Sequence, residues 1–311
     1  MTAPESFEVN RGEAEPPGPE PALANSDSAR RALPVAPNAF FGFFAYWGLF
    51  LGIYVGFTLI ANFLEITRLP ANWRFLVTEI LRFVAAVVPA LLLAKGEDRS
   101  FGDYGLPRRG ALGRLFWSGM LWGIAAISVL MLGLRAAGAF YFGRLTVLGL
   151  SSLEFALFWI VLFLLVALFE EFLLRGYPQF ALTRGIGFWP AALVLSILFG
   201  ASHWGNPGES RAGLLGAGAI GLFFCFTLRR TGNLWFAVGM HTAWNWGQSF
   251  IYAVPNSGLK AQERLLNSSL HGPDWLAGGT VGPEASVLLF VLLLLLAVAF
   301  HFAYPDVKYR A

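Results

Sequence analysis

Long apolar stretches separated by short polar connections make up most of the chain after residue 38. A helix that crosses the hydrocarbon core of a bilayer needs about 20 largely apolar residues. The pattern therefore predicts an all-α fold, a polytopic transmembrane helix bundle with about eight spans. The expected spans are Phe40–Phe63, Trp73–Ala94, Leu115–Leu134, Leu153–Arg175, Phe188–Trp204, Leu214–Leu228, Leu234–Val254 and Ala285–Tyr304.

The first 38 residues differ from the rest because they are rich in proline and contain no long apolar run. Such a segment cannot bury enough apolar surface to offset the entropy lost on ordering. We therefore expect two parts, a disordered cytoplasmic tail at residues 1–38 and a transmembrane domain at residues 39–311.

Charged residues are scarce, at 13% of a chain that is 56% hydrophobic, and no region is basic enough for a nucleic-acid partner. We therefore expect membrane lipid to surround the protein. Counted over alternate connections, 14 Lys and Arg fall on the side of the N-terminus and 7 on the other. By the positive-inside rule, both termini are predicted to lie in the cytoplasm. The single cysteine, Cys225, excludes an intrachain disulfide and a cysteine-based metal cluster.

Two further features concern packing. Gly48, Gly52 and Gly56 are spaced four apart in the first span, which predicts a close approach to another helix. The longest connection, Pro255 to Glu284, is rich in glycine; a surface loop is favoured there over a flexible lid.

Three short polar motifs interrupt the apolar spans. The fourth span ends in Glu170-Glu171-Phe172-Leu173-Leu174-Arg175, the fifth in Phe199-Gly200-Ala201-Ser202-His203, and the seventh contains His241-Thr242-Ala243-Trp244-Asn245. Ionisable groups at membrane depth are costly, so they indicate a functional site by default. Any one of these motifs alone is explained by an ion pair or by interhelical packing, but three together are not.

Helical spacing suggests how these residues pair. Glu171 and Arg175 are four apart and share a face, so they are expected to form an ion pair that leaves Glu170 free. His241 and Asn245 point in one direction, and Phe199 lies one turn before His203 and can hold its ring. Gly185-Ile186-Gly187 predicts a helix reversal, and Glu170 and His203 lie 16 and 17 residues on either side of Ile186. They are therefore expected at similar depth.

The chemistry available to this set is hydrolysis. A carboxylate in a dry site takes a proton from water, a histidine orients that water or protonates the leaving amine, and a second histidine with an amide stabilises an oxyanion. Alternatively, Glu170, His203 and His241 would bind Zn²⁺, which lowers the pKa of a bound water. Spacing does not separate a site without a cofactor from a zinc site.

The other polar residues of the spans are explained by structural roles. Glu79 and Arg82 are three apart in the second span and are expected to compensate each other. We assign no functional role to His271 or His301. No serine or cysteine accompanies a candidate base, which argues against a covalent nucleophile.

The three motifs resemble those of the CPBP family, which comprises CAAX proteases and bacteriocin-processing enzymes and is also called the Abi or type II CAAX prenyl endopeptidase family. Its pattern is Glu-Glu-x-x-x-Arg, Phe-x-x-x-His and His-x-x-x-Asn or Asp, matched here within a core at about residues 153–250. The resemblance implies a polytopic intramembrane protease, of glutamate or metallo type. Glu170 and His203 would then activate water, while His241 and Asn245 would stabilise the oxyanion and Arg175 would hold Glu171.

The implied substrate is a membrane-associated peptide or protein, prenylated or not, cleaved in a CAAX-type or bacteriocin-processing reaction. The implied location is the bacterial plasma membrane. A catalytically silent scaffold or immunity protein of the same fold is the main alternative. A transporter is less favoured, since the sequence lacks the paired halves of transporter folds.

Overall fold

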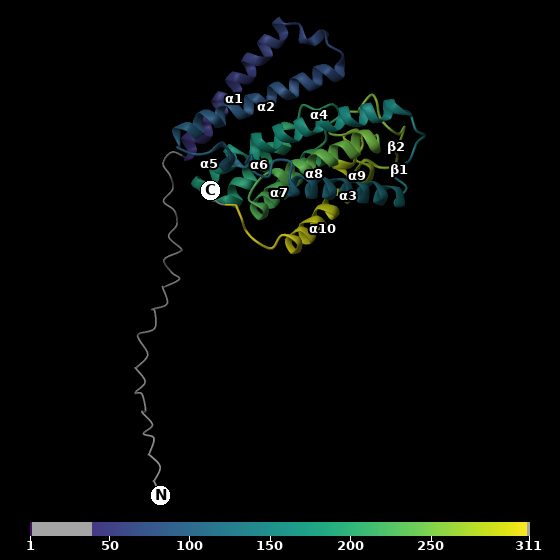
Figure 1. Cartoon of the computed structure of the whole chain (residues 1–311). Coiled ribbons are helices and arrows are strands. Elements are labelled where there is room, and N and C mark those ends of the chain that lie inside the picture. The colour runs from purple at the N-terminus through teal and green to yellow at the C-terminus, as the bar shows by residue number, and fades with distance from the viewer. Residues whose placement is uncertain (2–38, 310–311) are drawn as a thin grey trace. The chain divides into compact units, whose positions relative to one another are not determined.

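The computed structural model describes Met1 and residues 39–309. The predicted tail, apart from Met1, lies outside the described residues. A helix forms at each of the eight predicted spans, so the predicted all-α bundle is confirmed (Figure 1). These helices are α1 Ala39–Phe63, α2 Ala71–Gly96, α3 Arg114–Ala136, α4 Leu150–Arg175, α6 Phe188–Ser202, α7 Arg211–Thr231, α8 Trp235–Trp246 and α10 Val287–Ala303.

Among the described residues, five helical segments are long and apolar enough to cross a membrane. They are α1, α2, α3, α7 and the stretch Leu150–Ile186, whereas α6 and α10 are shorter apolar helices. Helix α8 ends at Trp246 and continues as one π-helical turn, η4, at Gly247–Ile251.

The fourth span is longer than predicted because a second helix, α5 at Tyr177–Ile186, follows after a break at Gly176. The chain then reverses at Gly187, whose φ of 84° lies in the left-handed region that glycine adopts without strain. The predicted reversal is therefore present, with α5 packed beside α6. The remaining short elements are η2 Ile66–Arg68, η3 Phe101–Tyr104, β1 Phe140–Tyr141, β2 Ser269–Leu270, α9 Asp274–Ala277 and η5 Pro283–Ala285.

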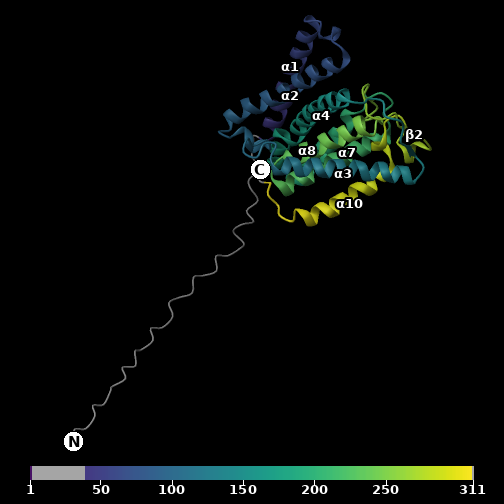
Figure 2. The ribbon, with the colours of Figure 1, turned by 45° about the vertical axis from the view of Figure 1, so that its right-hand side comes forward.

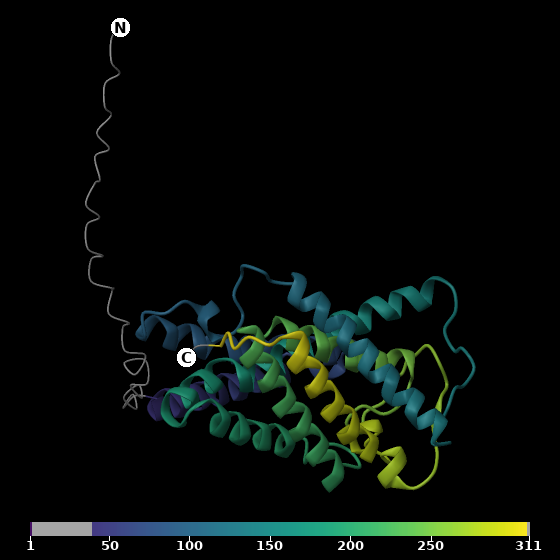
Figure 3. The ribbon, with the colours of Figure 1, turned by 90° about the horizontal axis from the view of Figure 1, so that it is seen from below.

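Helix α8 forms the centre of the bundle, and all but one of its residues are buried. It packs against α3 and α4, while α1 and α2 form a hairpin beside α4 and α5 (Figure 2). Viewed from below, α10 lies beside α3 and α7 (Figure 3). The motifs on α4 and α8 are thus largely in the interior, whereas His203, at the end of α6, is half-buried.

Glycines set the closest helix approach, but not those expected from the sequence. A Cβ on Gly119 of α3 would lie 2.1 Å from the Phe236 carbonyl oxygen, and one on Gly239 of α8 would lie 2.1 Å from that of Phe116. The α3 and α8 backbones are therefore in direct contact. The prediction for Gly48, Gly52 and Gly56 was wrong, since no described atom lies within 4 Å of a Cβ at any of the three.

The two ends of residues 39–309 lie on the same side of the bundle. Phe40 lies against Gly185, and the Tyr309 ring packs on Phe188 with 5.2 Å between ring centroids. Both contacts are at the turn between α5 and α6. This agrees with an even number of crossings, while the cytoplasmic placement of that side stays a prediction.

The connection at residues 255–284, called here the 255–284 segment, is folded against its neighbours. Strand β2 pairs antiparallel with β1, Trp159 Nε1 on α4 donates to the Glu263 carbonyl at 2.7 Å, and Leu265 N donates to the Phe250 carbonyl at 2.8 Å. The expectation of a simple surface loop was incomplete, because short-range sequence patterns do not report these long-range contacts.

Candidate active site

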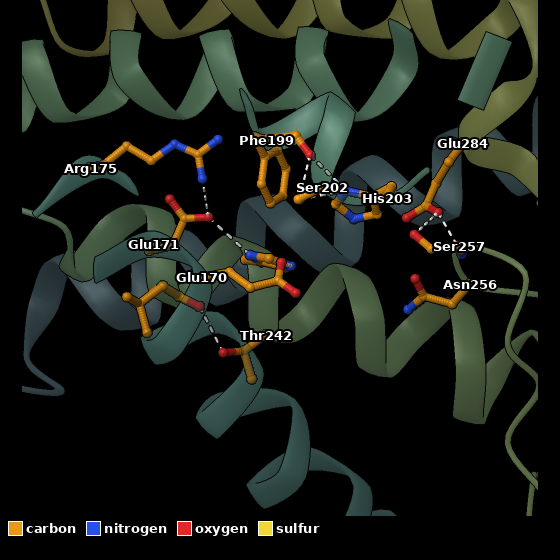
Figure 4. Close-up of polar contacts among 12 residues, drawn as sticks. Glu170, Glu171, Arg175, Phe199, Ser202, His203, Thr242, Asn256, Ser257 and Glu284 are labelled. Carbon is orange, nitrogen blue, oxygen red and sulfur yellow. Dashed lines mark hydrogen bonds and ion pairs between the residues drawn. The ribbon is translucent and has the colours of Figure 1, made fainter. Parts of the chain in front are cut away.

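The ion pair between Glu171 and Arg175 is fully buried on α4. Arg175 Nη1 lies 3.3 Å from Glu171 Oε1, and both side chains are 0% exposed, so the predicted contact is present (Figure 4). The guanidinium lies over the Phe199 ring, 4.3 Å from its centroid. A Cβ on Gly221 of α7 would come close to Arg175 Nη2, so the glycine leaves room for the guanidinium in this position.

Glu171 has a second partner that helical spacing did not reveal. His241 Nδ1, on α8, donates to Glu171 Oε1 at 3.0 Å. His241 Nε2 lies 3.7 Å from Glu170 Oε2, and the ring stacks on Phe224. Glu171 thus holds the His241 ring through Nδ1, and Glu170 lies beside Nε2.

His203 caps the C-terminus of α6. Its Nδ1 donates to the Phe199 carbonyl at 2.8 Å, and its ring meets the Phe199 ring edge-on, with centroids 4.9 Å apart. Because a carbonyl oxygen only accepts hydrogen bonds, the neutral ring carries its proton on Nδ1. Nε2 is then available as an acceptor.

A cavity of about 1180 Å³ brings the motif residues together. Glu170, Phe199, His203, His241 and Asn245 all line it, and the Glu170 side chain is 26% exposed. Among the described residues, none hydrogen-bonds to the Asn245 side chain, so its amide is available to a bound molecule. Glu171 and Arg175 lie behind the wall of the cavity.

Three other features of the cavity bear on its chemistry. Glu79 and Arg82 line it and pair at 2.7 Å, as the sequence predicted. Sequence reasoning missed Glu284 and Ser257, which enter the cavity from the two ends of the 255–284 segment. Glu284 stands just before an apolar run, and this position could have pointed to it. Glu170 was noticed because it stands at the end of such a run.

The candidate zinc ligands do not converge. Within residues 39–309, no group of three or more His, Cys, Asp or Glu is placed to hold a metal ion. Nδ1 of each histidine is hydrogen-bonded, in His241 to Glu171 and in His203 to the Phe199 carbonyl, which is also usual for zinc-binding histidines. Because the three candidate ligands are not gathered into one group, the chemistry below uses the side chains alone.

A bundle of long apolar helices around a cavity that contains several ionisable side chains defines a multi-pass membrane protein. Residues 152–247, about a third of the chain, match the family described as type II CAAX prenyl endopeptidase Rce1-like. The matched residues contain all three motifs, so the predicted resemblance to the CAAX protease family is confirmed over this part of the chain. No curated protein and no solved structure gives a significant match.

Proposed function

We propose that this protein is an intramembrane endopeptidase that hydrolyses a peptide bond of a membrane-associated substrate with water activated by Glu170. The observation that carries the proposal is the division between two adjacent carboxylates. Glu171 is fully buried and bound to Arg175 and His241, whereas Glu170 enters the cavity without a hydrogen-bonding cation. A carboxylate in that position is available to accept a proton.

In the proposed reaction, Glu170 removes a proton from a water molecule. His203 Nε2 accepts a hydrogen bond from the remaining O–H group. The water oxygen attacks the carbonyl carbon, and the oxyanion receives hydrogen bonds from the Asn245 amide and, when Nε2 carries a proton, from His241. Glu170 then passes its proton to the nitrogen as the C–N bond breaks. General base catalysis typically contributes about 10²–10⁴-fold, and each oxyanion donor contributes about 3 kcal/mol.

The apolar walls of the cavity support a membrane-associated substrate. Phe43 and Trp47 of α1 and Phe163 and Phe169 of α4 also line the cavity. Such walls suit apolar peptide side chains or a lipid group attached to the peptide. A prenylated peptide is one member of this class.

The test uses the purified full chain with a library of membrane-anchored peptides. Glu170→Gln keeps the shape of the side chain but cannot take a proton, so cleavage should fall by about 10² or more. Glu154→Gln, on the exposed face of the same helix, is the matched control and should cleave normally.

Two outcomes contradict the proposal. Full cleavage by a folded Glu170→Gln variant would remove Glu170 as the base. Absence of cleavage by the unaltered protein across peptides with and without a lipid group would favour the silent scaffold.

A further inference from the structure

Glu284 is a buried carboxylate that belongs to none of the three motifs. It lies in η5, directly before α10, and is 7% exposed. Its Oε2 accepts two hydrogen bonds from Ser257, one from the backbone N–H and one from the hydroxyl, each at 2.8 Å. Its Oε1 has no partner among the described residues and is not among the fully buried unpaired atoms, so it faces the cavity.

The surrounding backbone is shaped to hold this carboxylate. Ser257 has a φ of 46°, a left-handed conformation that is strained for a residue other than glycine and that clusters at functional sites. On the other side, a Cβ on Gly216 of α7 would lie 2.1 Å from the Glu284 carbonyl oxygen. The glycine therefore allows η5 to pack directly on α7, which places the Glu284 side chain at the cavity wall.

Glu284 has no arginine or lysine partner in the described part of the chain, although two histidines lie near it. No Lys or Arg of residues 39–309 forms an ion pair with it. Figure 4 shows its carboxylate on the His203 side of the site. Burial raises the pKa of Glu284, and the Ser257 hydrogen bonds and the nearby His203 and His241 oppose that rise.

Of the acidic side chains that line the cavity, the others already have a partner or a proposed role, and Glu284 does not. Three carboxylates of the described chain line it: Glu79, Glu170 and Glu284. Glu79 is paired with Arg82, and Glu170 is assigned to the water. Glu284 is thus the carboxylate free to bind a donor supplied by the substrate. Hydrolysis of an amide supplies one, since the leaving nitrogen is an N–H before cleavage and an ammonium group after it.

We propose that Glu284 is a substrate-binding residue that accepts a hydrogen bond from the leaving side of the scissile bond and binds the new amino terminus as an ammonium. This subsite rests on the proposed function, because it takes the nitrogen that the hydrolysis releases. The ligand class is a primary ammonium attached to a peptide. The Ser257 hydroxyl and N–H hold the carboxylate with Oε1 directed at that nitrogen.

Binding of the leaving-side product tests this without relying on turnover. The probes are one short apolar peptide with a free α-amino group and the same peptide N-acetylated, titrated against the full chain in detergent. We expect the unaltered protein to bind the free amine at least about tenfold more tightly, the size of one charge-assisted hydrogen bond. In Glu284→Gln, which is isosteric and still accepts from Ser257, this preference should disappear.

The controls separate the possible failures. Glu263→Gln removes a carboxylate from the same segment, where Glu263 bonds Asn72, and should keep the preference. Equal binding of both probes by the unaltered protein would overturn the subsite. A preference retained in Glu284→Gln would do so as well. An N-acetylated peptide with an internal lysine that binds as tightly as the free amine would assign the carboxylate to a lysine side chain. The proposed hydrolysis is judged separately, by the cleavage assay with Glu170→Gln.

Discussion

At the scale of single residues, Glu170 and Glu171 show how neighbours in sequence acquire different chemistry. Successive residues on a helix point about 100° apart, so one carboxylate faces the cavity and the other faces the protein interior. Glu171 is bound there by Arg175 and by His241. The structure therefore gives Glu171 a second task beyond charge compensation, which is to orient His241.

Reversing the buried pair tests both tasks. Glu171→Arg or Arg175→Glu alone leaves an uncompensated buried charge and should cost about 3–5 kcal/mol of stability. The double variant should recover part of this loss, as measured by thermal unfolding of the four proteins in detergent. Its peptidase activity should stay low, because an arginine at position 171 cannot accept the hydrogen bond from His241. Zero coupling in the cycle would contradict direct pairing.

Spacing along one helix accounts for the part of the site that the sequence predicted. The pair Glu171 and Arg175 and the common face of His241 and Asn245 follow from a separation of four residues. The bond from Glu171 to His241 joins residues 70 apart, and the one from Ser257 to Glu284 joins residues 27 apart across a folded connection. Periodicity states which face a residue occupies, but not which other helix or segment packs against that face.

Metal dependence is a further prediction about individual side chains. Because Glu170, His203 and His241 are not gathered into one group of ligands within residues 39–309, we expect stringent chelation to leave cleavage largely intact. Elemental analysis of the purified protein should give less than one zinc per chain. One tightly bound zinc that is lost together with activity in His203→Ala would make the enzyme a metalloprotease.

At the scale of elements, the contact between α3 and α8 determines where His241 lies. Gly239 is two residues before His241 and touches the α3 backbone. Gly239→Ala should force the helices apart, cost about 1–3 kcal/mol of stability and lower activity by moving the imidazole. Gly52→Ala, with no described atom within 4 Å of its Cβ, is the matched control. Equal unfolding temperatures for the two variants would contradict this packing.

The helices themselves were the most predictable part of the molecule, because a long apolar run has few alternatives in a bilayer. The fourth span was predicted to end at Arg175, as α4 does, but the following helix α5 was not predicted, since Arg175, Gly176 and Pro178 interrupt the apolar run there. The spacing of Gly48, Gly52 and Gly56 was misleading, because small residues permit a close approach but do not supply the partner helix. The partner is determined by the whole arrangement.

At the scale of the whole molecule, Phe40 and Tyr309 both lie at the turn between α5 and α6, and the positive-inside rule predicts that this side is cytoplasmic. The only cysteine, Cys225, is fully buried, so the protein suits single-cysteine labelling. In a Cys225→Ser background, Arg108→Cys should react with a membrane-impermeant maleimide only after the cells are opened. Arg144→Cys, at the opposite end of α3, should react in intact spheroplasts. The reverse pattern would invert the predicted orientation.

Glu284 belongs to a connection between helices, and this affects how such proteins can diverge in evolution. The proposed water-activating groups are held by helices α4, α6 and α8, whereas the proposed amine subsite is held by the 255–284 segment. Insertions and deletions are tolerated far better in connections than in packed helices. Lineages can therefore alter which bond is selected while the apparatus that breaks it is inherited unchanged.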